Sequence, residues 1–300
     1  MKAAISIHNI SKSYGGKHPV MALKDICLQI GKGELFGLIG PDGAGKTSLF
    51  RILATLLTAD SGTATVEGFD VVNDYREIRN RIGYMPGRFS LYQDLSVEEN
   101  LEFFATVFGS TIQDNYDLIA DIYRQIEPFR KRRAGKLSGG MKQKLALCCA
   151  LIHRPAVLLL DEPTTGVDAV SRREFWTMLE KLKASGITVF VSTPYMDEAS
   201  LCDRVALIQS GGILSVDTPA NVAAAYPFTL YEIKAENNYH LLEQLKKQSN
   251  VRSCYISGEY LRVVFRSDAD LHIHYPAKEL KEVKPTIEDC FIQLMSDESN

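Results

Sequence analysis

The stretch Gly40-Pro41-Asp42-Gly43-Ala44-Gly45-Lys46-Thr47 has the spacing G-x-x-x-x-G-K-[ST] and is followed by Ser48. It lies between a short apolar strand, Glu34 to Ile39, and a helical pattern. In that position the glycines are expected to turn successive backbone amides inward at the positive end of a helix. Lys46 can then neutralise the outer phosphates and Thr47 can hold Mg²⁺, so the stretch predicts a nucleoside triphosphate site.

A second apolar run ends in two carboxylates. Residues 156–160, Ala-Val-Leu-Leu-Leu, are apolar at every position, which is typical of a strand covered on both faces. Asp161 is expected to hold the metal through water, with a solvated residue at the strand end as the alternative. Glu162 is then placed to polarise a water in line with the γ-phosphate. Catalysis in such a site consists of positioning and electrostatics rather than covalent chemistry.

Strand-like and helical patterns alternate through the first 220 residues, which predicts an α/β fold with a mostly parallel sheet. Ile187 to Val191 is a third buried strand. The helix before it is expected to begin at Ser171, with Glu174 completing a capping box, and to end near Gly186. Strand, helix and strand together form a βαβ unit.

Other segments depart from this alternation. The first 33 residues and the stretch Gly62 to Phe69 predict antiparallel strands, and residues from about 88 to 150 predict an inserted helical subdomain. We place a boundary between an N-terminal domain, 1–222, and a small α+β domain, 223–300. In the second domain the patterns predict two strands and two helices: Leu230 to Ala235, Tyr260 to Arg266, Asn238 to Gln248 and Thr286 to Met295.

The composition excludes several classes of protein. With 45% hydrophobic and 24% charged residues and a net charge of −3, the chain is ordinary for a globular protein and has no global field for nucleic acid or anionic membranes. The longest apolar run, Leu145 to Ile152, is far shorter than the roughly 20 residues of a membrane span. The start, Met1 to Ser6, shows no secretory signal pattern. The six scattered cysteines indicate reduced thiols.

A second candidate anion site occurs at Leu137-Ser138-Gly139-Gly140-Met141-Lys142-Gln143. Ser138 is a favourable N-cap residue, and the run after Met141 is helical. This segment therefore predicts another helix start with exposed backbone amides, which favours anion binding.

With these motifs, the sequence resembles the ATP-binding subunit of an ABC transporter. The resemblance rests on the phosphate loop, the signature Leu137 to Gln143, the segment Leu158 to Thr164 and the following Gly166-Val167-Asp168, in the family's order. Tyr14 matches the aromatic residue that stacks on adenine, although alone it could be a surface aromatic. The motifs cover residues 1–220, and Pro285 to Ile292 is similar to the tail of the multidrug-export, ABC-2-type branch.

The resemblance implies a P-loop ABC cassette: a mostly parallel core sheet, an antiparallel β subdomain and an inserted helical subdomain. It also implies two subunits packed head to tail, each ATP and its Mg²⁺ lying between one phosphate loop and the partner's signature residues. These implied trans residues are Ser138, Gly139, Gly140 and Gln143, with Asp168 in the adjoining D-loop. Membrane permease subunits would contact the region from Arg88 to Phe104, which places the chain in the cytoplasm at the inner face of the membrane.

Two polar positions of the family are missing. Gly87 replaces a glutamine that contacts Mg²⁺ and the attacking water, and Pro194 replaces a histidine that bonds the γ-phosphate. Losing a preorganised donor costs about 10²–10³ in rate, whereas losing a hydrogen bond to a charged group costs only about 1.5–3 kcal/mol of binding. We therefore expect this site to hold ATP but hydrolyse it slowly, unless Arg88 or Tyr195 substitutes. The intact signature favours a heterodimer with a second, complete ATP-binding subunit.

Three functions remain open from sequence: an ATPase subunit of an exporter, a non-hydrolysing subunit gated by nucleotide, and a soluble ABC ATPase of DNA repair or translation. The third would need a coiled-coil insertion or a second cassette, which this sequence lacks. The basic cluster Arg130 to Arg133 with Lys136 is either a solvated face or a contact with the partner or its nucleotide. The basic cluster contains few aromatic residues on which bases could stack, so nucleic-acid binding is not expected. His272 and His274 suggest either surface positions or a metal site.

Overall fold

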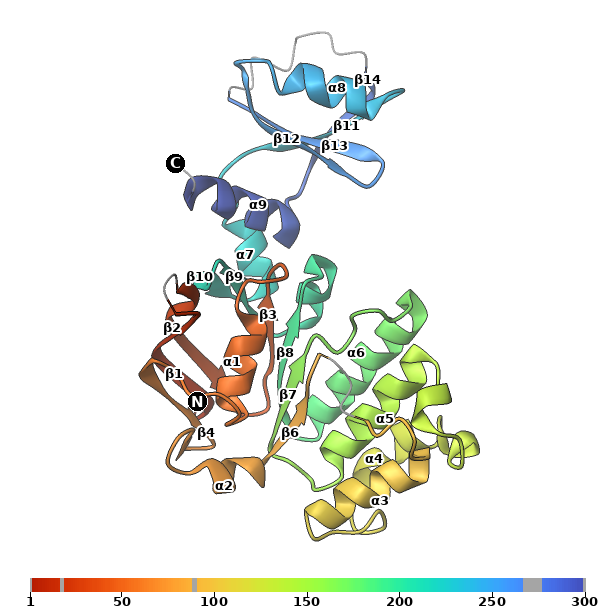
Figure 1. Cartoon of the computed structure of the whole chain (residues 1–300). Helices are drawn as coiled ribbons and strands as arrows, with labels where there is room; N and C mark the ends of the chain where they lie inside the picture. The colour runs from red at the N-terminus through yellow and green to blue at the C-terminus, as the bar shows by residue number, and fades with distance from the viewer. Residues whose placement is uncertain (1, 17–18, 88–90, 267–276, 299–300) are drawn as a thin grey trace. The chain divides into compact units, whose positions relative to one another are not determined.

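The structure, a computed structural model, describes residues 2–16, 19–87, 91–266 and 277–298 (Figure 1). The chain divides into two units, Met1–Pro219 and Ala220–Asn300, and each is described by itself. Helix α7, Pro219–Ala224, contains this division and also the boundary that the sequence predicted after residue 222. The predicted metal-site candidates His272 and His274 lie outside the described residues.

A six-stranded sheet in the order β10-β9-β3-β8-β7-β6 forms the centre of the first unit. All neighbouring strands are parallel except the last pair, β9 and β10. Strands β3, β7 and β8 are buried at every position, which confirms the prediction from their apolar runs. The strands are β3 (Leu35–Ile39), β6 (Ile82–Met85), β7 (Val157–Asp161), β8 (Thr188–Thr193), β9 (Arg204–Gln209) and β10 (Gly212–Asp217).

Helices α1 (Lys46–Leu53) and α6 (Ala169–Ala184) lie on opposite sides of this sheet (Figure 1). The predicted start of α6 at Ser171 is wrong by two residues. Asp168 caps the helix instead, because its carboxylate accepts the backbone N–H groups of Val170 and Ser171. Aspartate at this position also complements the positive end of the helix dipole.

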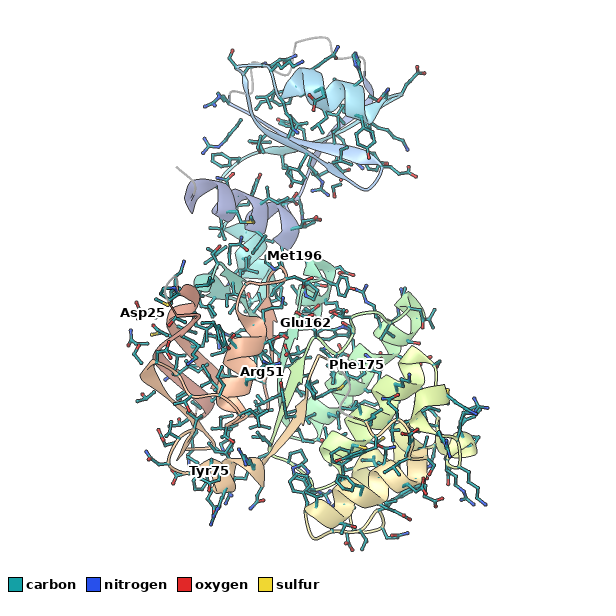
Figure 2. All side chains as sticks on the ribbon, in the orientation of Figure 1. Asp25, Arg51, Tyr75, Glu162, Phe175 and Met196 are labelled. Atoms are coloured by element: carbon teal, nitrogen blue, oxygen red, sulfur yellow. The ribbon has the colours of Figure 1, made fainter. Side chains whose placement is uncertain are left out.

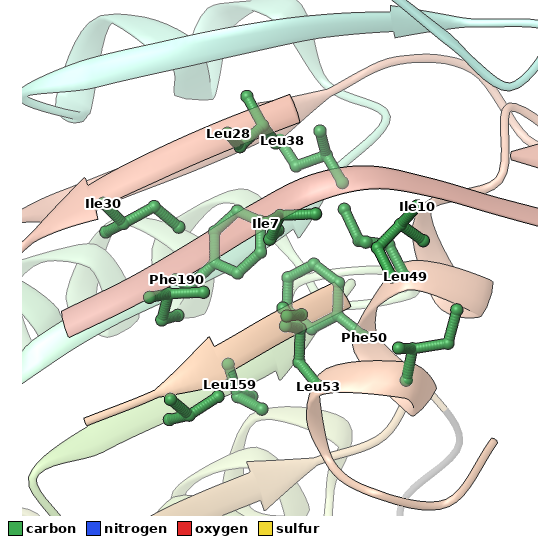
Figure 3. Close-up of a cluster of buried hydrophobic side chains, with 14 of the residues drawn as sticks. Ile7, Ile10, Leu28, Ile30, Leu38, Leu49, Phe50, Leu53, Leu159 and Phe190 are labelled. Carbon is green, nitrogen blue, oxygen red and sulfur yellow. The ribbon is translucent and has the colours of Figure 1, made fainter. Parts of the chain in front are cut away.

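The predicted antiparallel strands form a second sheet in the order β2-β1-β4-β5. Its apolar face packs on α1, so that Ile7 and Leu28 from this sheet meet Phe50 of α1 and Phe190 of β8 in one core (Figure 3). Phe50 and Phe190 stack with ring centroids 4.6 Å apart. The strands are β1 (Ala3–Tyr14), β2 (Val20–Gly31), β4 (Ser61–Val66) and β5 (Phe69–Asp70), and the short helix α2 (Tyr75–Arg79) follows them.

The predicted helical insert is confirmed in its described part. Helices α3 (Val97–Val107) and α4 (Tyr116–Tyr123) both contact α5 (Gly139–Leu151). A capping box, in which Ser96 and Glu99 bond each other's backbone N–H groups, fixes the start of α3. Short 3₁₀ turns occur at η1 (Glu127–Phe129), η2 (Ala134–Lys136) and, outside the insert, η3 (Met196–Leu201).

The second unit is an α+β fold, and its four predicted elements are confirmed. Its sheet has the order β12-β13-β11-β14, and helix α8 packs on one face through Leu241 and Leu245. The sequence did not predict strands β12 and β14 or helix α7, because these segments show no clear periodic pattern of apolar residues. The elements after α7 are β11 (Leu230–Ala235), α8 (Asn238–Leu245), β12 (Val251–Ser257), β13 (Tyr260–Phe265), β14 (Ala277–Val283) and α9 (Ile287–Glu298).

Among the described residues, no helix combines the length and the apolar character that crossing a bilayer requires.

Candidate functional site

The phosphate loop, residues 40–47, joins the buried end of β3 to α1. Gly45 has a φ of 104°, and a Cβ atom there would lie 2.2 Å from the carbonyl oxygen of Ala22. A Cβ at Gly40 would lie 2.2 Å from the carbonyl oxygen of Ile208. These positions accept only glycine, because any side chain would collide with backbone. The resulting turn brings backbone amides to the N-terminus of an eight-residue helix, where the dipole favours an anion.

Lys46 is folded across this loop. Its ammonium donates hydrogen bonds to the carbonyl oxygens of Gly40 (2.8 Å) and Pro41 (2.9 Å), and the residue is 3% exposed. The same Nζ lies 3.0 Å from the Oε1 atom of Glu162. A buried ammonium is stable only when it is paired and hydrogen-bonded, and here both conditions are met. The cation is therefore held at the mouth of the anion-binding turn.

The two carboxylates at the end of β7 are held in different ways. Asp161 is buried and accepts a hydrogen bond from the Ser192 hydroxyl (2.9 Å); burial raises its pKa, which the hydrogen bonds from Ser192 and Thr47 oppose. Glu162 has a φ of 50° and lies beside the phosphate loop (Figure 2). Left-handed backbone at a non-glycine residue costs about 1–2 kcal/mol. In this backbone conformation the Glu162 carboxylate lies against the Lys46 ammonium.

The oxygen donors around Asp161 suit magnesium. Thr47 offers a hydroxyl and Asp161 a carboxylate, and both are the hard ligands that Mg²⁺ prefers. Nowhere in the described residues do three histidine, cysteine or acidic side chains cluster as a metal site would require. This agrees with Mg²⁺ chemistry at phosphates, in which one or two protein ligands are joined by substrate oxygens and water.

Tyr14 lies at the end of β1, close to the start of α1. Its ring is 41% exposed, and its hydroxyl lies 3.1 Å from the Ser48 hydroxyl. An exposed aromatic face attached beside an anion-binding helix end has the geometry that a nucleobase needs for stacking. Tyr14 and the phosphate loop are therefore brought together, although 25 residues separate Tyr14 from the loop's first residue in the chain.

The two departures from the family pattern lie at different edges of the site, Gly87 beside Asp161 and Pro194 after the strand end that bonds the phosphate loop. A Cβ atom on Gly87 would lie 3.2 Å from the Asp161 carbonyl oxygen and 3.9 Å from its Oδ2 atom. Pro194 follows Thr193, whose carbonyl oxygen accepts the N–H of Gly40 at 3.3 Å. The Tyr195 ring packs on the guanidinium of Arg172, 4.1 Å from the ring centroid. Arg88, the other proposed substitute, lies outside the described residues.

A buried polar cluster beside Pro194 was missed from sequence. The Glu198 carboxylate, in a residue 2% exposed, accepts hydrogen bonds from the hydroxyls of Thr193 (2.5 Å) and Thr164 (3.1 Å) and from Arg172 Nε (3.1 Å). It thereby joins the end of β8 to the segment after Glu162 and to α6. No local pattern signals this role, because two of its three partners, Thr164 and Arg172, come from distant parts of the chain.

The signature segment begins α5, with Ser138 as N-cap accepting the N–H of Met141 at 3.3 Å. Ser138 and Gly139 are exposed, and a Cβ on Gly140 would lie 2.6 Å from the Ser171 hydroxyl. Gln143 was expected to face a partner subunit, but the structure places it in the interior of this chain. It is 1% exposed, and its amide donates to the carbonyl oxygen of Pro163 at 2.6 Å, because its turn of α5 faces the β7–α6 connection.

These features define a class: a P-loop nucleoside triphosphatase with a second anion-binding helix end on an inserted helical subdomain. The family model described as "ABC transporter" matches residues 23–165. The Nod factor export ATP-binding protein I of Rhizobium sp. (strain N33) is 33% identical over 97% of its length and 98% of this chain. The chain belongs to the ABC transporter family of ATP-binding proteins, whose cassettes are ATPases coupled to transport.

Other relatives agree with this assignment. The probable multidrug ABC transporter ATP-binding protein YbhF of Escherichia coli (strain K12) is 39% identical over 98% of this chain. The chain spans about half of that relative, 52% of its length. The dimeric cassette MJ0796, in a post-hydrolysis state bound to ADP and Pi, superposes with a TM-score of 0.65 and 25% identity, covering 71% of this chain and 98% of MJ0796.

Proposed function

We propose that this chain binds ATP and Mg²⁺ and energises export through a separate membrane permease, at the inner face of the membrane. The observation that carries the proposal is the convergence of Lys46, Asp161 and Glu162 on the phosphate loop. Support for export comes from the relatives, which are named for multidrug transport, Nod factor export and doxorubicin resistance.

In this proposal each part of the site has one task. Tyr14 stacks on adenine, while Lys46 and the loop amides bind the phosphates. Thr47 and Asp161 hold Mg²⁺, which would neutralise charge on the phosphates when bound. Glu162 accepts a proton from the attacking water. The nucleotide contacts are assigned to Tyr14, Gly40, Pro41, Asp42, Gly43, Ala44, Gly45, Lys46, Thr47 and Ser48.

The partner subunit completes the site. The helix start formed by Ser138, Gly139 and Gly140, of which Ser138 and Gly139 are exposed and Gly140 is buried, would cap the nucleotide of a second cassette, with Asp168 in the adjoining loop. The dimeric MJ0796 cassette supports such an arrangement. Because Gly87 and Pro194 weaken only this chain's own site, we propose a heterodimer in which the partner's phosphate loop works with this chain's signature.

Two substitutions test this asymmetry. In the assembled transporter, Ser138→Arg is expected to remove most ATPase activity, since a bulky cation replaces the helix cap at the partner's active site. Lys46→Ala is expected to leave a substantial fraction, because it affects the slower site. Steady-state phosphate release measures both variants, and equal losses would contradict the asymmetric arrangement.

A groove beside the site is proposed as the permease contact. It has a volume of about 460 Å³ and lies between β6 and helices α3 and α5. Leu56 and Val107, on its rim, are 58% and 60% exposed. Such an apolar rim on a nucleotide-binding unit is typical of a protein contact. Its lining includes Leu91 and Phe104, which belong to the region that the family resemblance assigned to the permease.

Placing a charge on this rim is expected to detach the chain from the membrane. In a Leu56→Asp, Val107→Asp variant the share of protein that sediments with membranes of the source cells should fall severalfold, while ATP affinity stays unchanged. Val72→Asp is the matched control, because Val72 is also 58% exposed but does not line the groove. Equal sedimentation of the groove and control variants would exclude this contact surface.

A second candidate function is favoured by the same two departures, Gly87 and Pro194: a subunit that binds ATP, closes the dimer and leaves hydrolysis to its partner. This second function is supported if the full-length chain binds ATP tightly but turns it over no faster than a Glu162→Gln variant does. Turnover clearly above that background selects the ATPase.

A further inference from the structure

We propose that Asp60 is the positioning residue of the adenine subsite: its carboxylate fixes the strand end that presents Tyr14. The inference rests on the proposed role of Tyr14 in stacking on the base. Asp60 lies just before β4, far from the phosphate loop's glycines in sequence, and no motif singles it out. Its contribution is visible only from the contacts that its two carboxylate oxygens make.

The Asp60 carboxylate accepts hydrogen bonds from the two residues immediately before Tyr14. Oδ1 accepts a hydrogen bond from Lys12 Nζ at 2.6 Å, and Oδ2 accepts the Ser13 N–H at 2.6 Å and the Ser13 hydroxyl at 2.7 Å. In return, the Asp60 N–H donates to the Ser11 carbonyl oxygen at 2.9 Å. The bonds from Lys12 and Ser13 lower the pKa of Asp60 to about 2, so the acceptor stays ionised across the physiological range.

This support matters because β1 ends at Tyr14, a residue that is 41% exposed. Ser13 and Tyr14 pair with Met21 and Val20 of β2 along one edge of the strand, and Asp60 lies at the other edge, where β4 begins at Ser61. On its other side the hydroxyl meets Ser48 of α1 at 3.1 Å, and Lys12 Nζ lies 5.9 Å from the ring centroid. Asp60 therefore supports the edge of β1 that faces away from β2 just before Tyr14, while Ser48 meets the hydroxyl at the tip of the ring. Between these two anchors the aromatic face is held at the start of α1, where a bound nucleotide would place its base.

The residue acts through Tyr14 and touches no nucleotide, so its effect should depend on the base. Stacking on an aromatic ring contributes to the binding of a base, so Tyr14→Ala is expected to weaken ATP binding about tenfold. Asp60→Ala should weaken it about three- to tenfold, since a loosened strand end presents the ring only part of the time. Neither change should affect inorganic tripolyphosphate, which uses the phosphate loop without a base.

The experiment is a double-mutant cycle on the full-length chain, with calorimetric titration of Mg-ATP and Mg-tripolyphosphate. The wild type is compared with Tyr14→Ala, Asp60→Ala and the double variant. If Asp60 acts through Tyr14, the double variant binds ATP no more weakly than Tyr14→Ala alone. Asp114→Ala is the control, because Asp114 also accepts a backbone N–H, from Thr111 at 2.8 Å, but lies in the helical subdomain. It should leave both affinities unchanged.

Each other outcome has a distinct meaning. Multiplicative losses in the double variant, or a loss of tripolyphosphate affinity in Asp60→Ala, would overturn the inference, because Asp60 would then support the site by another route. If Tyr14→Ala itself leaves ATP affinity unchanged, the proposed adenine subsite is wrong and the role of Asp60 falls with it. Asp60→Asn guards against misfolding: it keeps the side-chain volume, and its smaller loss of ATP affinity should also disappear in the Tyr14→Ala background.

Discussion

A Gly87→Gln, Pro194→His variant is expected to hydrolyse ATP about 10²–10³-fold faster at this chain's own site than the wild type. A Cβ atom on Gly87 would lie 3.9 Å from the Asp161 Oδ2 atom and 3.9 Å from the Glu162 Cβ atom, and Pro194 follows the strand end bonded to Gly40. Glycine has no side chain to orient a water, and proline has no donor for developing charge on the phosphates. The two new side chains would supply polar groups that stabilise the transition state more than the bound ATP. The hydrolysis rate should therefore change more than the affinity for ATP.

At position 87 a Cβ atom needs a small shift of its neighbour. The Cβ of a glutamine at 87 would lie 3.2 Å from the Asp161 carbonyl oxygen, which a shift of a few tenths of an ångström relieves. Phosphate release by the full-length chain, at concentrations that support ATP-dependent dimers, measures the gain. Adding Glu162→Gln should abolish it, because the gain needs the general base. An unchanged rate with intact ATP binding would show that the missing groups are not what limits this site.

Phe190→Ala is expected to lower the free energy of unfolding of the first unit by about 3–5 kcal/mol. Phe190 is fully buried, stacked on Phe50 and in edge contact with Phe36 at 5.7 Å. It joins the parallel sheet, α1 and the antiparallel sheet in one core (Figure 3), so a cavity there cannot close by moving one element alone. Trp176, the single tryptophan of the sequence, lies in this unit and reports its unfolding by fluorescence.

The matched control for this substitution is Phe103→Ala. Phe103 is 39% exposed on α3, so its removal should cost less than about 1 kcal/mol. Equal shifts in the denaturant midpoint for the two variants would contradict the assignment of Phe190 to the centre of the core.

The sequence by itself determined the parts that depend on local geometry. The phosphate loop requires glycine where φ is positive or a backbone passes within 2.2 Å, and these requirements leave a fixed spacing in the chain. Runs of apolar and β-branched residues predicted β3, β7 and β8, because strands covered on both faces have few polar positions. Ser138 was also predicted correctly as a helix cap, because capping is a local contact between residues three apart in the chain.

Only the tertiary structure decided contacts between distant segments. Gln143 belongs to a motif expected to face a partner, yet the packing of α5 against the β7–α6 connection buries it on Pro163. Helix α6 begins at Ala169 rather than Ser171, and this prediction was wrong although capping is local, because two candidate N-cap residues, Asp168 and Ser171, lie three residues apart and the Asp168 carboxylate accepts the N–H groups. Asp60 and Glu198 acquire their roles from partners tens of residues away, since hydrogen bonds form between neighbours in space and leave no periodic trace in the sequence.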